Sequence, residues 1–429
     1  MPTEIPVIRP LSSGWLAGAC AFFVAFGALL VRSSSATPAV TWMFIYRLTD
    51  FDSVPAIIAF IRGVRVPIPI VIGLGEIFDN YLFGDSWLVD CLLYRVALVG
   101  AFLLAIVLSP RTVTGLATSL FSSAVFLWGT VLVHPGNPQV YDILYPFFLL
   151  GFILLIERVR RGGSRGRKQV MQSFAAGFLL SMSELSRPFV LFLLPVLLLM
   201  GFLNLRGATR RARIFFLLPL LLISGGWHLY IGITHGELTW TNHSGFNLQR
   251  SWPKVPLPAL LPETNGAPLG AGRWANLDTP EHQENSRRLE TAILGYALDH
   301  PVGMLSGLGR RVLLLLAAPT TIYGHHPSHP ILWLYRPLVW LASFALLLRL
   351  ARYARIAYAR PLQIVEEPAG QAALAALLSI LLLAAGEGGE QARFLLSVLP
   401  LLAIVLAAEA DQGLAFIAGL QRKELQDCR

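Results

Sequence analysis

The chain has 429 residues, of which 55% are hydrophobic and only 14% are charged, and its formal net charge is +9 at pH 7. Soluble globular domains usually carry about 25% charged residues, so this composition excludes an ordinary water-soluble enzyme. The positive charges stand in short runs between apolar blocks. That is the positive-inside pattern of membrane proteins, and it argues against a nucleic-acid partner.

The apolar blocks approach the roughly 20 residues that a helix needs to cross a bilayer. Because backbone polar groups must be satisfied inside lipid, blocks of this length should be helices. The sequence therefore predicts an all-α integral membrane protein with about ten transmembrane helices, formed as a single membrane domain over residues 1–429. The predicted spans are 14–32, 87–108, 113–133, 139–157, 169–185, 188–204, 214–233, 330–350, 369–386 and 392–409.

Three basic clusters, at residues 158–168, 206–213 and 349–360, set the predicted orientation. If all three face the cytoplasm, the chain crosses the cell membrane several times and both of its termini are cytoplasmic. The clusters can then also contact anionic membrane lipids on that side. The stretch 289–319 is ambiguous, since counting it as a span would reverse the later topology. We interpret it as a helix in the outer interface from which Arg310 and Arg311 snorkel.

This topology leaves two large extracytoplasmic segments. The first outer loop covers about 33–86, where prolines divide apolar stretches that are too short to cross. Short interfacial helices are expected there. The large outer loop covers about 234–329 and is rich in Pro, Gly, Asn and Trp. We expect one membrane domain with an outward-facing cavity.

Carboxylates on the predicted outer side are the first functional candidates. Asp50 and Asp52 stand two residues apart in the first outer loop. One could act as a general base while the other orients an acceptor or holds a metal; alternatively they are ordinary loop carboxylates. Asp142 lies at the outer mouth of the fourth span, where stabilisation by the helix dipole is the competing explanation.

Two polar breaks supply cations on the same side. Glu184 and Arg187 lie in SELSRP, and Glu390 and Arg393 lie where the last span begins. An arginine can hold a phosphate with two parallel hydrogen bonds, so both arginines are candidate phosphate ligands. The alternatives are a Glu–Arg pair at a helical hairpin for the first and interfacial snorkelling for the second.

Other polar residues in the large outer loop suggest sugar recognition more than metal binding. In TNHSGFNLQRSW, Asn247 and Arg250 can hydrogen-bond a sugar and the ring of Trp252 can stack on it, although such residues are common in any outer loop. The histidines of GHHPSHP have no cysteine or carboxylate nearby, so no metal site is predicted there. No cofactor is required by any motif, although a divalent metal at the Asp50–Asp52 pair remains open.

The order of these short motifs resembles the GT-C superfamily of membrane glycosyltransferases. The resemblance is greatest to the bacterial branch of the protein-mannosyltransferase and aminoarabinose-transferase family. It rests on TDFDS in the first outer loop, VYDILYPFFLL, SELSRPFVLFLLP, SGFNLQ, DHP and ARFLLSVLPLLAIVLA, and it covers nearly the whole chain. The family's first loop often reads Asp-Glu followed by Tyr, whereas this chain has Asp-Phe-Asp-Ser.

The resemblance implies an inverting transferase that moves a sugar from a polyprenyl-phosphate carrier to an extracytoplasmic acceptor, which could be an envelope glycan, a lipid or a protein. Asp50 or Asp52 would be the base and Asp142 a second carboxylate. Arg187 and Arg393 would neutralise the departing phosphate. A transporter or lipid flippase, and a non-catalytic subunit with the same fold, remain alternatives. The sugar, the acceptor and the carrier length stay open.

Overall fold

The architecture is taken from a computed structural model. It describes residues 12–33, 92–133, 140–162, 166–187, 189–235, 244–261, 280–317, 331–356, 362–386 and 395–427. Within these ranges every regular element is a helix and no strand is present. The all-α fold expected from the apolar blocks is therefore confirmed for this part of the chain.

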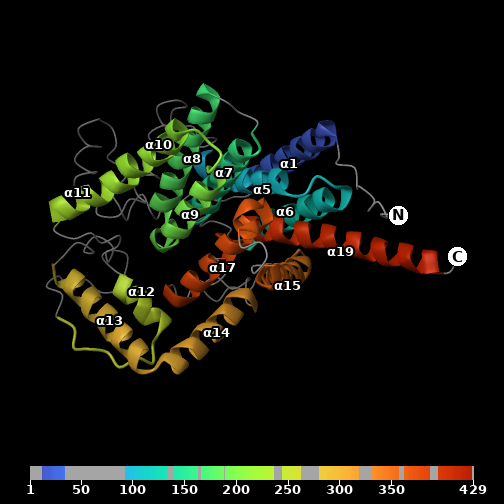
Figure 1. The fold of residues 1–429 in the computed structure, drawn as a ribbon. Helices are drawn as coiled ribbons and strands as arrows, with labels where there is room; N and C mark the ends of the chain where they lie inside the picture. The colour runs from blue at the N-terminus through green and yellow to red at the C-terminus, as the bar shows by residue number, and fades with distance from the viewer. Residues whose placement is uncertain are drawn as a thin grey trace.

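The helices follow one another in the order expected from the apolar blocks, and Figure 1 labels all of them except η2 and α16. In chain order they are α1 (Ser13–Ser33), α5 (Leu92–Leu108), α6 (Val113–Val133), α7 (Val140–Arg160), α8 (Arg167–Ser186), α9 (Val190–Asn204), α10 (Arg210–Pro219), η2 (Leu220–Gly225), α11 (Gly226–His235), α12 (Ser244–Ser251), α13 (Pro280–Asp299), α14 (Pro301–Ala317), α15 (Leu332–Ile356), α16 (Gln363–Glu366), α17 (Pro368–Gly386) and α19 (Leu399–Asp427).

Six of these helices are long and apolar enough to cross a membrane. They provide the candidate spans Ser13–Leu30, Val113–Val131, Arg210–Thr234, Trp333–Ile356, Pro368–Gly386 and Leu399–Ala418. Two further apolar helices, Arg95–Leu108 and Val190–Asn204, are shorter. The chain is thus a membrane-embedded helical protein. The count of ten spans, the single domain and the orientation stay predictions.

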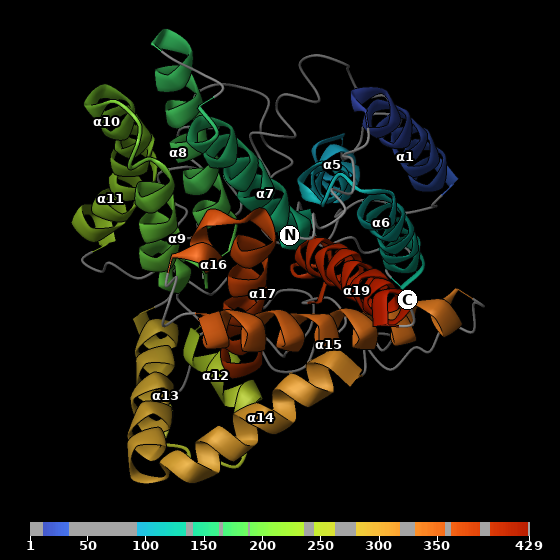
Figure 2. The same ribbon diagram turned by 45° about the vertical axis from the view of Figure 1, so that its right-hand side comes forward.

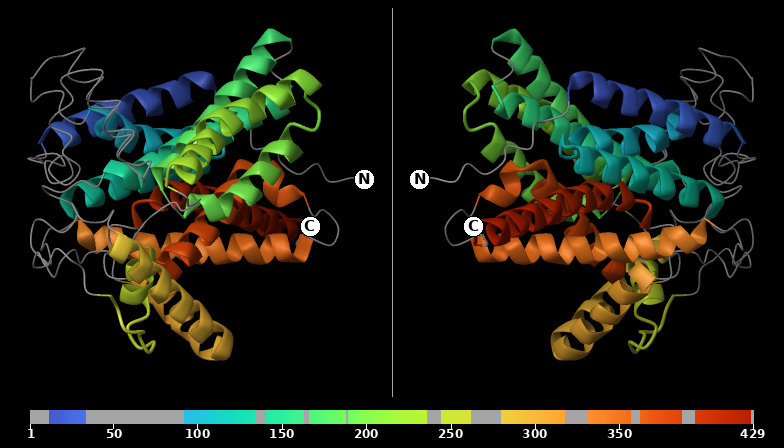
Figure 3. Two further views of the ribbon diagram at one scale, coloured as in Figure 1. Left: turned by 90° about the vertical axis from the view of Figure 1, so that its left-hand side faces the viewer. Right: turned by 90° about the vertical axis from the view of Figure 1, so that its right-hand side faces the viewer.

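The long helices run side by side in a bundle with two distinct ends (Figure 3). We call one the basic end; it carries Arg158, Arg161, Lys168 and Arg349, and α1 begins there while α19 ends there. The other, which we call the far end, carries the start of α7 and the end of α8. A continuous core of buried apolar side chains extends from Phe23 in α1 to Leu406 in α19.

One glycine brings two helices of the bundle into backbone contact. Gly177 of α8 faces α10 so closely that a Cβ at this position would overlap the Phe216 carbonyl oxygen. Small residues at helix crossings permit such approach inside membranes. The crossing holds α8 against the helix formed by α10, η2 and α11, which supplies part of the cluster described below.

The predicted span 214–233 is one long helix with an irregular middle. A π-helical segment, η2, joins α10 to α11 directly after Pro219. Proline lacks the backbone N–H of a regular helix and its ring crowds the preceding turn. Widened π turns inside helices frequently mark functional sites.

The ambiguous stretch 289–319 forms parts of two helices and not one. α13 ends at Asp299 and α14 begins at Pro301, a residue favoured in the first turn because its missing N–H needs no partner there. The two helices form a V at the edge of the molecule (Figures 1 and 2). Neither is among the six candidate spans.

Arg311 differs from the expectation that it snorkels. Arg310 is exposed, but the Arg311 guanidinium carbon lies 4.5 Å from the centre of the Trp252 ring, and its Nη1 donates to the Ala384 carbonyl at 3.4 Å. Trp252 Nε1 in turn donates to the Ala385 carbonyl at 2.9 Å. α14 is therefore joined to the end of α17 by one direct hydrogen bond and also through Trp252, which holds Arg311 by a cation–π contact and α17 by a second hydrogen bond.

Candidate functional site

A buried ion pair lies at the far end of the bundle. Asp142, in the first turn of α7, pairs through Oδ1 with Nη2 of Arg187 at the end of α8. The Asp142 side chain is fully buried and that of Arg187 is 3% exposed. The sequence singled out both residues, and the structure brings them together.

The local backbone explains why Arg187 reaches α7. Arg187 caps the C-terminus of α8 with extended dihedral angles, φ −150° and ψ 127°. Because the next residue in the sequence is Pro188, whose ring disfavours a helical residue before it, the helix ends here. The side chain consequently leaves the helical face that carries Glu184.

Glu184 is the centre of a second buried contact. Its Oε2 accepts a hydrogen bond from Ser224 Oγ at 2.7 Å, and its Oε1 lies 3.0 Å from His228 Nε2. Ser224 belongs to η2 and His228 to α11. Four residues apart on one helix, they project to the same side and hold one carboxylate together.

Polar contacts join this cluster to the rest of the bundle. The Tyr145 hydroxyl and Ser379 Oγ, from α7 and α17, lie 2.8 Å apart. Ser183 Oγ donates to the Tyr145 carbonyl at 3.3 Å, and Ser397 Oγ donates to the Asp142 carbonyl at 3.1 Å. Ser397 follows Arg393 by four residues in the sequence. We refer to Asp142, Glu184, Arg187, Ser224 and His228 as the far-end cluster.

The other predicted site residues fall in two groups. Asn247, half-buried, and Arg250, exposed, lie on α12, which packs on α13 and α17, and neither makes a hydrogen bond to the far-end cluster. Asp50, Asp52, Glu390 and Arg393 lie outside the described residues. The base and the second phosphate ligand therefore stay predictions.

Sequence reasoning missed His228 and Ser224. Both stand in the apolar run LLLISGGWHLYIG, where an ionisable ring is costly and marks a functional site. His228 could have been found on that ground alone. Tyr145 and Ser379 give no comparable signal, because aromatic and small hydroxyl residues are ordinary inside membrane helices.

The far-end cluster can orient charge but holds no evident metal site. Among the described residues, no group of three or more metal-ligating side chains comes together. The contact with Asp142 orients the Arg187 guanidinium and places a fixed, buried positive charge at this end of the bundle. An arginine fixed in this way suits a charge that develops during a reaction.

Comparison with known proteins adds no relative. No family model, curated protein or solved structure matches the chain. The resemblance to GT-C glycosyltransferases thus stays a prediction that rests on the order of short motifs.

Proposed function

We propose that the chain is an inverting glycosyltransferase of the cell membrane. It takes its sugar from a polyprenyl-phosphate carrier on the extracytoplasmic side. The observation that carries the proposal is the far-end cluster, in which Asp142 pairs with Arg187 and Glu184 contacts His228 among buried helices. The motif order of the sequence supplies the reaction class.

The energetic argument starts from the cost of burying charge. Transferring an ion from water into a protein interior costs several kcal/mol even after relaxation, and the attraction within a pair roughly offsets that cost. Buried ion pairs are therefore weak sources of stability. Ionisable residues within membrane helices accordingly mark functional sites by default, and this cluster gathers them from three helices.

In the proposed reaction, Asp50 or Asp52 removes the proton from an acceptor hydroxyl. The acceptor oxygen forms a bond to the anomeric carbon from the side opposite the carrier. The bond from that carbon to the phosphate oxygen breaks, and the lipid phosphate leaves with the electron pair. Arg187, oriented by Asp142, and Arg393 stabilise the negative charge of the leaving group. Asn247 and Arg250 contact the sugar or the acceptor.

A sugar-release assay tests the proposal. Purified protein is incubated with a panel of polyprenyl-phosphate sugars, and release of sugar from the lipid is measured. Donor-specific release should fall by about 100-fold or more in at least one of Asp50→Asn and Asp52→Asn. It should fall by roughly 10-fold to 1000-fold in Arg187→Gln, because a charge-stabilising donor is lost.

The matched control is Glu284→Gln. Glu284 makes an exposed pair with Arg288 on α13 and is not a member of the far-end cluster, so this variant should keep its turnover. Full activity of Asp50→Asn, Asp52→Asn and Arg187→Gln together would remove the assigned roles. Absence of release from every donor, with folded protein, would favour a non-catalytic subunit.

A transporter or lipid flippase is the second candidate, because one observation favours it. η2 interrupts the helix Arg210–Thr234 near its middle, and Ser224 of this segment contacts buried Glu184. Broken helices with polar groups near the midplane are typical of transporters. Reconstitution in liposomes separates the two functions: transbilayer movement of a polyprenyl-phosphate lipid without sugar release would establish the second.

A further inference from the structure

A second polar region lies at the opposite end of the molecule, at the basic end. A cavity of about 690 Å³ opens there between the ends of α5, α7, α8, α15 and α17 and the middle of α19. Its lining includes the apolar side chains of Val107, Leu154 and Ala408. Five cations and three carboxylates line it, namely Arg111, Arg158, Arg161, Lys168 and Arg349 against Glu157, Glu367 and Asp411.

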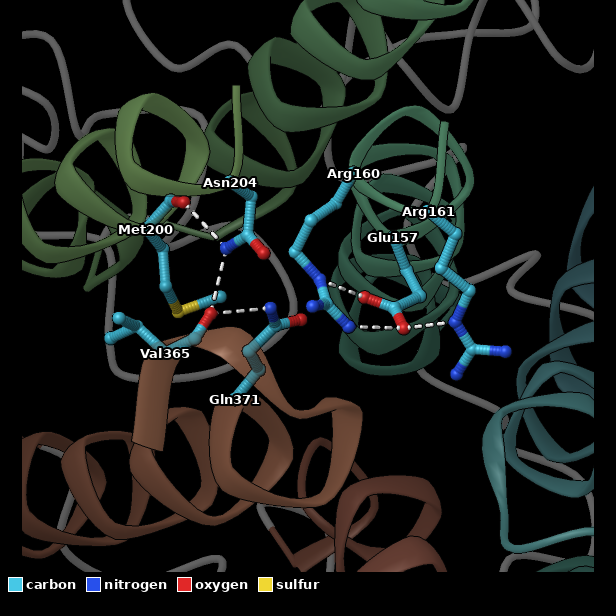
Figure 4. Close-up of polar contacts among 7 residues, drawn as sticks. All are labelled: Glu157, Arg160, Arg161, Met200, Asn204, Val365 and Gln371. Carbon is cyan, nitrogen blue, oxygen red and sulfur yellow. Dashed lines mark hydrogen bonds and ion pairs between the residues drawn. The ribbon is translucent and has the colours of Figure 1, made fainter. Parts of the chain in front are cut away.

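The three carboxylates are already engaged by neighbouring groups. Figure 4 shows Glu157 between Arg160 and Arg161, with Arg160 Nε 2.8 Å and Arg161 Nε 2.5 Å from its oxygens. Glu367 accepts a hydrogen bond from the Tyr353 hydroxyl at 2.9 Å. Asp411 accepts one from Thr112 Oγ1 at 2.5 Å. These contacts reduce the capacity of the carboxylates to neutralise further cations.

Two of the lining arginines are likewise committed to carboxylates. Arg349 is buried, and its Nε lies 2.6 Å from Glu409 Oε1. Arg161 is paired with Glu157. By contrast, Arg111, Arg158 and Lys168 make no hydrogen bond or ion pair within the described residues, and all three are exposed. We call these three the free cations of the cavity.

The wall beside Glu367 is built by side-chain to backbone hydrogen bonds. Asn204 Nδ2 donates to the Val365 carbonyl at 2.7 Å, and Gln371 Nε2 donates to the same carbonyl at 2.7 Å (Figure 4). These bonds fix α16 and the start of α17 against α9. The cavity is therefore framed by an ordered part of the bundle, not by a loose surface loop.

We propose that this cavity binds the phosphate group of an anionic phosphate ester. The free cations add exposed positive charge to its lining, and Arg and Lys are the residues that bind phosphate in proteins. Basic pockets between membrane helices on the cytoplasmic side are suited to lipid headgroups. An anionic phospholipid is one source of such a phosphate, with its chains against the apolar part of the lining, and a soluble phosphate ester is the other.

The binding assay uses the full-length protein in detergent. Phosphatidylglycerol and phosphatidylcholine in mixed micelles are compared by native mass spectrometry, and glycerol 3-phosphate is measured by equilibrium dialysis. The test variant carries Arg111→Gln, Arg158→Gln and Lys168→Gln. Since each cation near a membrane surface contributes roughly fivefold, the triple variant should bind about 100-fold more weakly.

The control variant carries Arg210→Gln, Arg213→Gln and Arg355→Gln. It removes the same total charge from exposed positions that do not line the cavity, so it should lose far less affinity than the test variant. If the test triple does not fold, Lys168→Gln alone replaces it, with an expected loss of about fivefold.

The outcomes distinguish a lipid source of the phosphate from a soluble source, and they also test the proposal itself. Binding of phosphatidylglycerol that is lost only in the test variant supports a lipid source, and the same pattern with glycerol 3-phosphate supports a soluble one. Equal losses in both triple variants, equal affinity for phosphatidylcholine, or no binding of either phosphate probe would overturn the proposal. The result is independent of sugar release, because the free cations lie at the other end of the bundle.

Discussion

The two ends of the bundle handle charge differently. At the far end, Asp142 and Arg187 are buried and oppose each other directly, and Glu184 is held by Ser224 and His228. At the basic end, Arg349 and Glu409 also form a buried pair, but cations outnumber carboxylates around a cavity, and three exposed cations make no hydrogen bond or ion pair within the described residues. The difference separates a site that holds charge in a fixed geometry from one that offers charge to a ligand.

Removing Asp142 is the strongest test of the difference between the two ends. Asp142→Ala leaves the Arg187 guanidinium buried without its carboxylate, and we expect a loss of about 3–5 kcal/mol in the free energy of unfolding. Unfolding in SDS followed by circular dichroism measures it. The double variant Asp142→Ala, Arg187→Ala should lose less than the sum of the two single variants. Strict additivity would show that the pair is not coupled.

The second test alters the crossing that carries the far-end cluster. Gly177→Ala places a methyl group against the Phe216 carbonyl oxygen and forces α8 away from α10, at a cost of about 2–3 kcal/mol. Gly413→Ala in α19 is the matched variant, because a Cβ there meets nothing within 4 Å. It should stabilise the helix by about 0.5–1 kcal/mol. Equal effects of the two substitutions would contradict the close approach.

The third test applies the same kind of deletion at the basic end. Glu409→Ala removes the partner of Arg349 and Arg352. We expect a smaller loss than for Asp142→Ala, about 1–2 kcal/mol, because Arg352 can turn to water and Glu367 remains 3.9 Å from Arg349. A loss as large as that of Asp142→Ala would erase the distinction between the two ends.

The smallest effect is expected on the V-shaped pair of helices. Glu284→Gln removes an exposed contact with Arg288 at 3.0 Å within α13. Pairs of this kind contribute about 0.3–0.5 kcal/mol, and salt screens them. The same unfolding assay at low and high salt measures it. A loss above about 1 kcal/mol would mean that Glu284 has a structural role that its exposure does not suggest.

The sequence predicted the presence of helices well, because apolar blocks indicate which segments avoid water. The residues at which the helices begin and end were less predictable. The last predicted span, 392–409, corresponds to α19, which continues to Asp427 because a helix can extend past the apolar part of its sequence. The break between α13 and α14 was missed, although Pro301 provided the signal.

The candidate site was only partly predictable, for a physical reason. Asp142 and Arg187 were identified because charges in apolar surroundings are conspicuous, but their pairing joins two helices and cannot be read from spacing. For Arg187 the spacing offered only a Glu184–Arg187 pair, as the alternative to a phosphate ligand. The extended backbone at Arg187, before Pro188, brings this side chain to Asp142 of α7, which the spacing did not indicate. The contact of Glu184 with His228 spans 44 residues of sequence and depends on how α8 packs against α10 and η2, which lead into α11.

The π-helical segment sets the angular phase at which α11 meets the far-end cluster. A π turn takes one residue more than the α turn it replaces, so removing one residue from 220–223 would let the segment return to a regular helix with α11 close to its present orientation. A regular helix absorbs no such deletion: removing Gly226 or Trp227 would turn His228 by about 100°, away from the side that faces Glu184. One lost residue is thus tolerated in the π segment and harmful just after it, although neither deletion removes a side chain of the cluster.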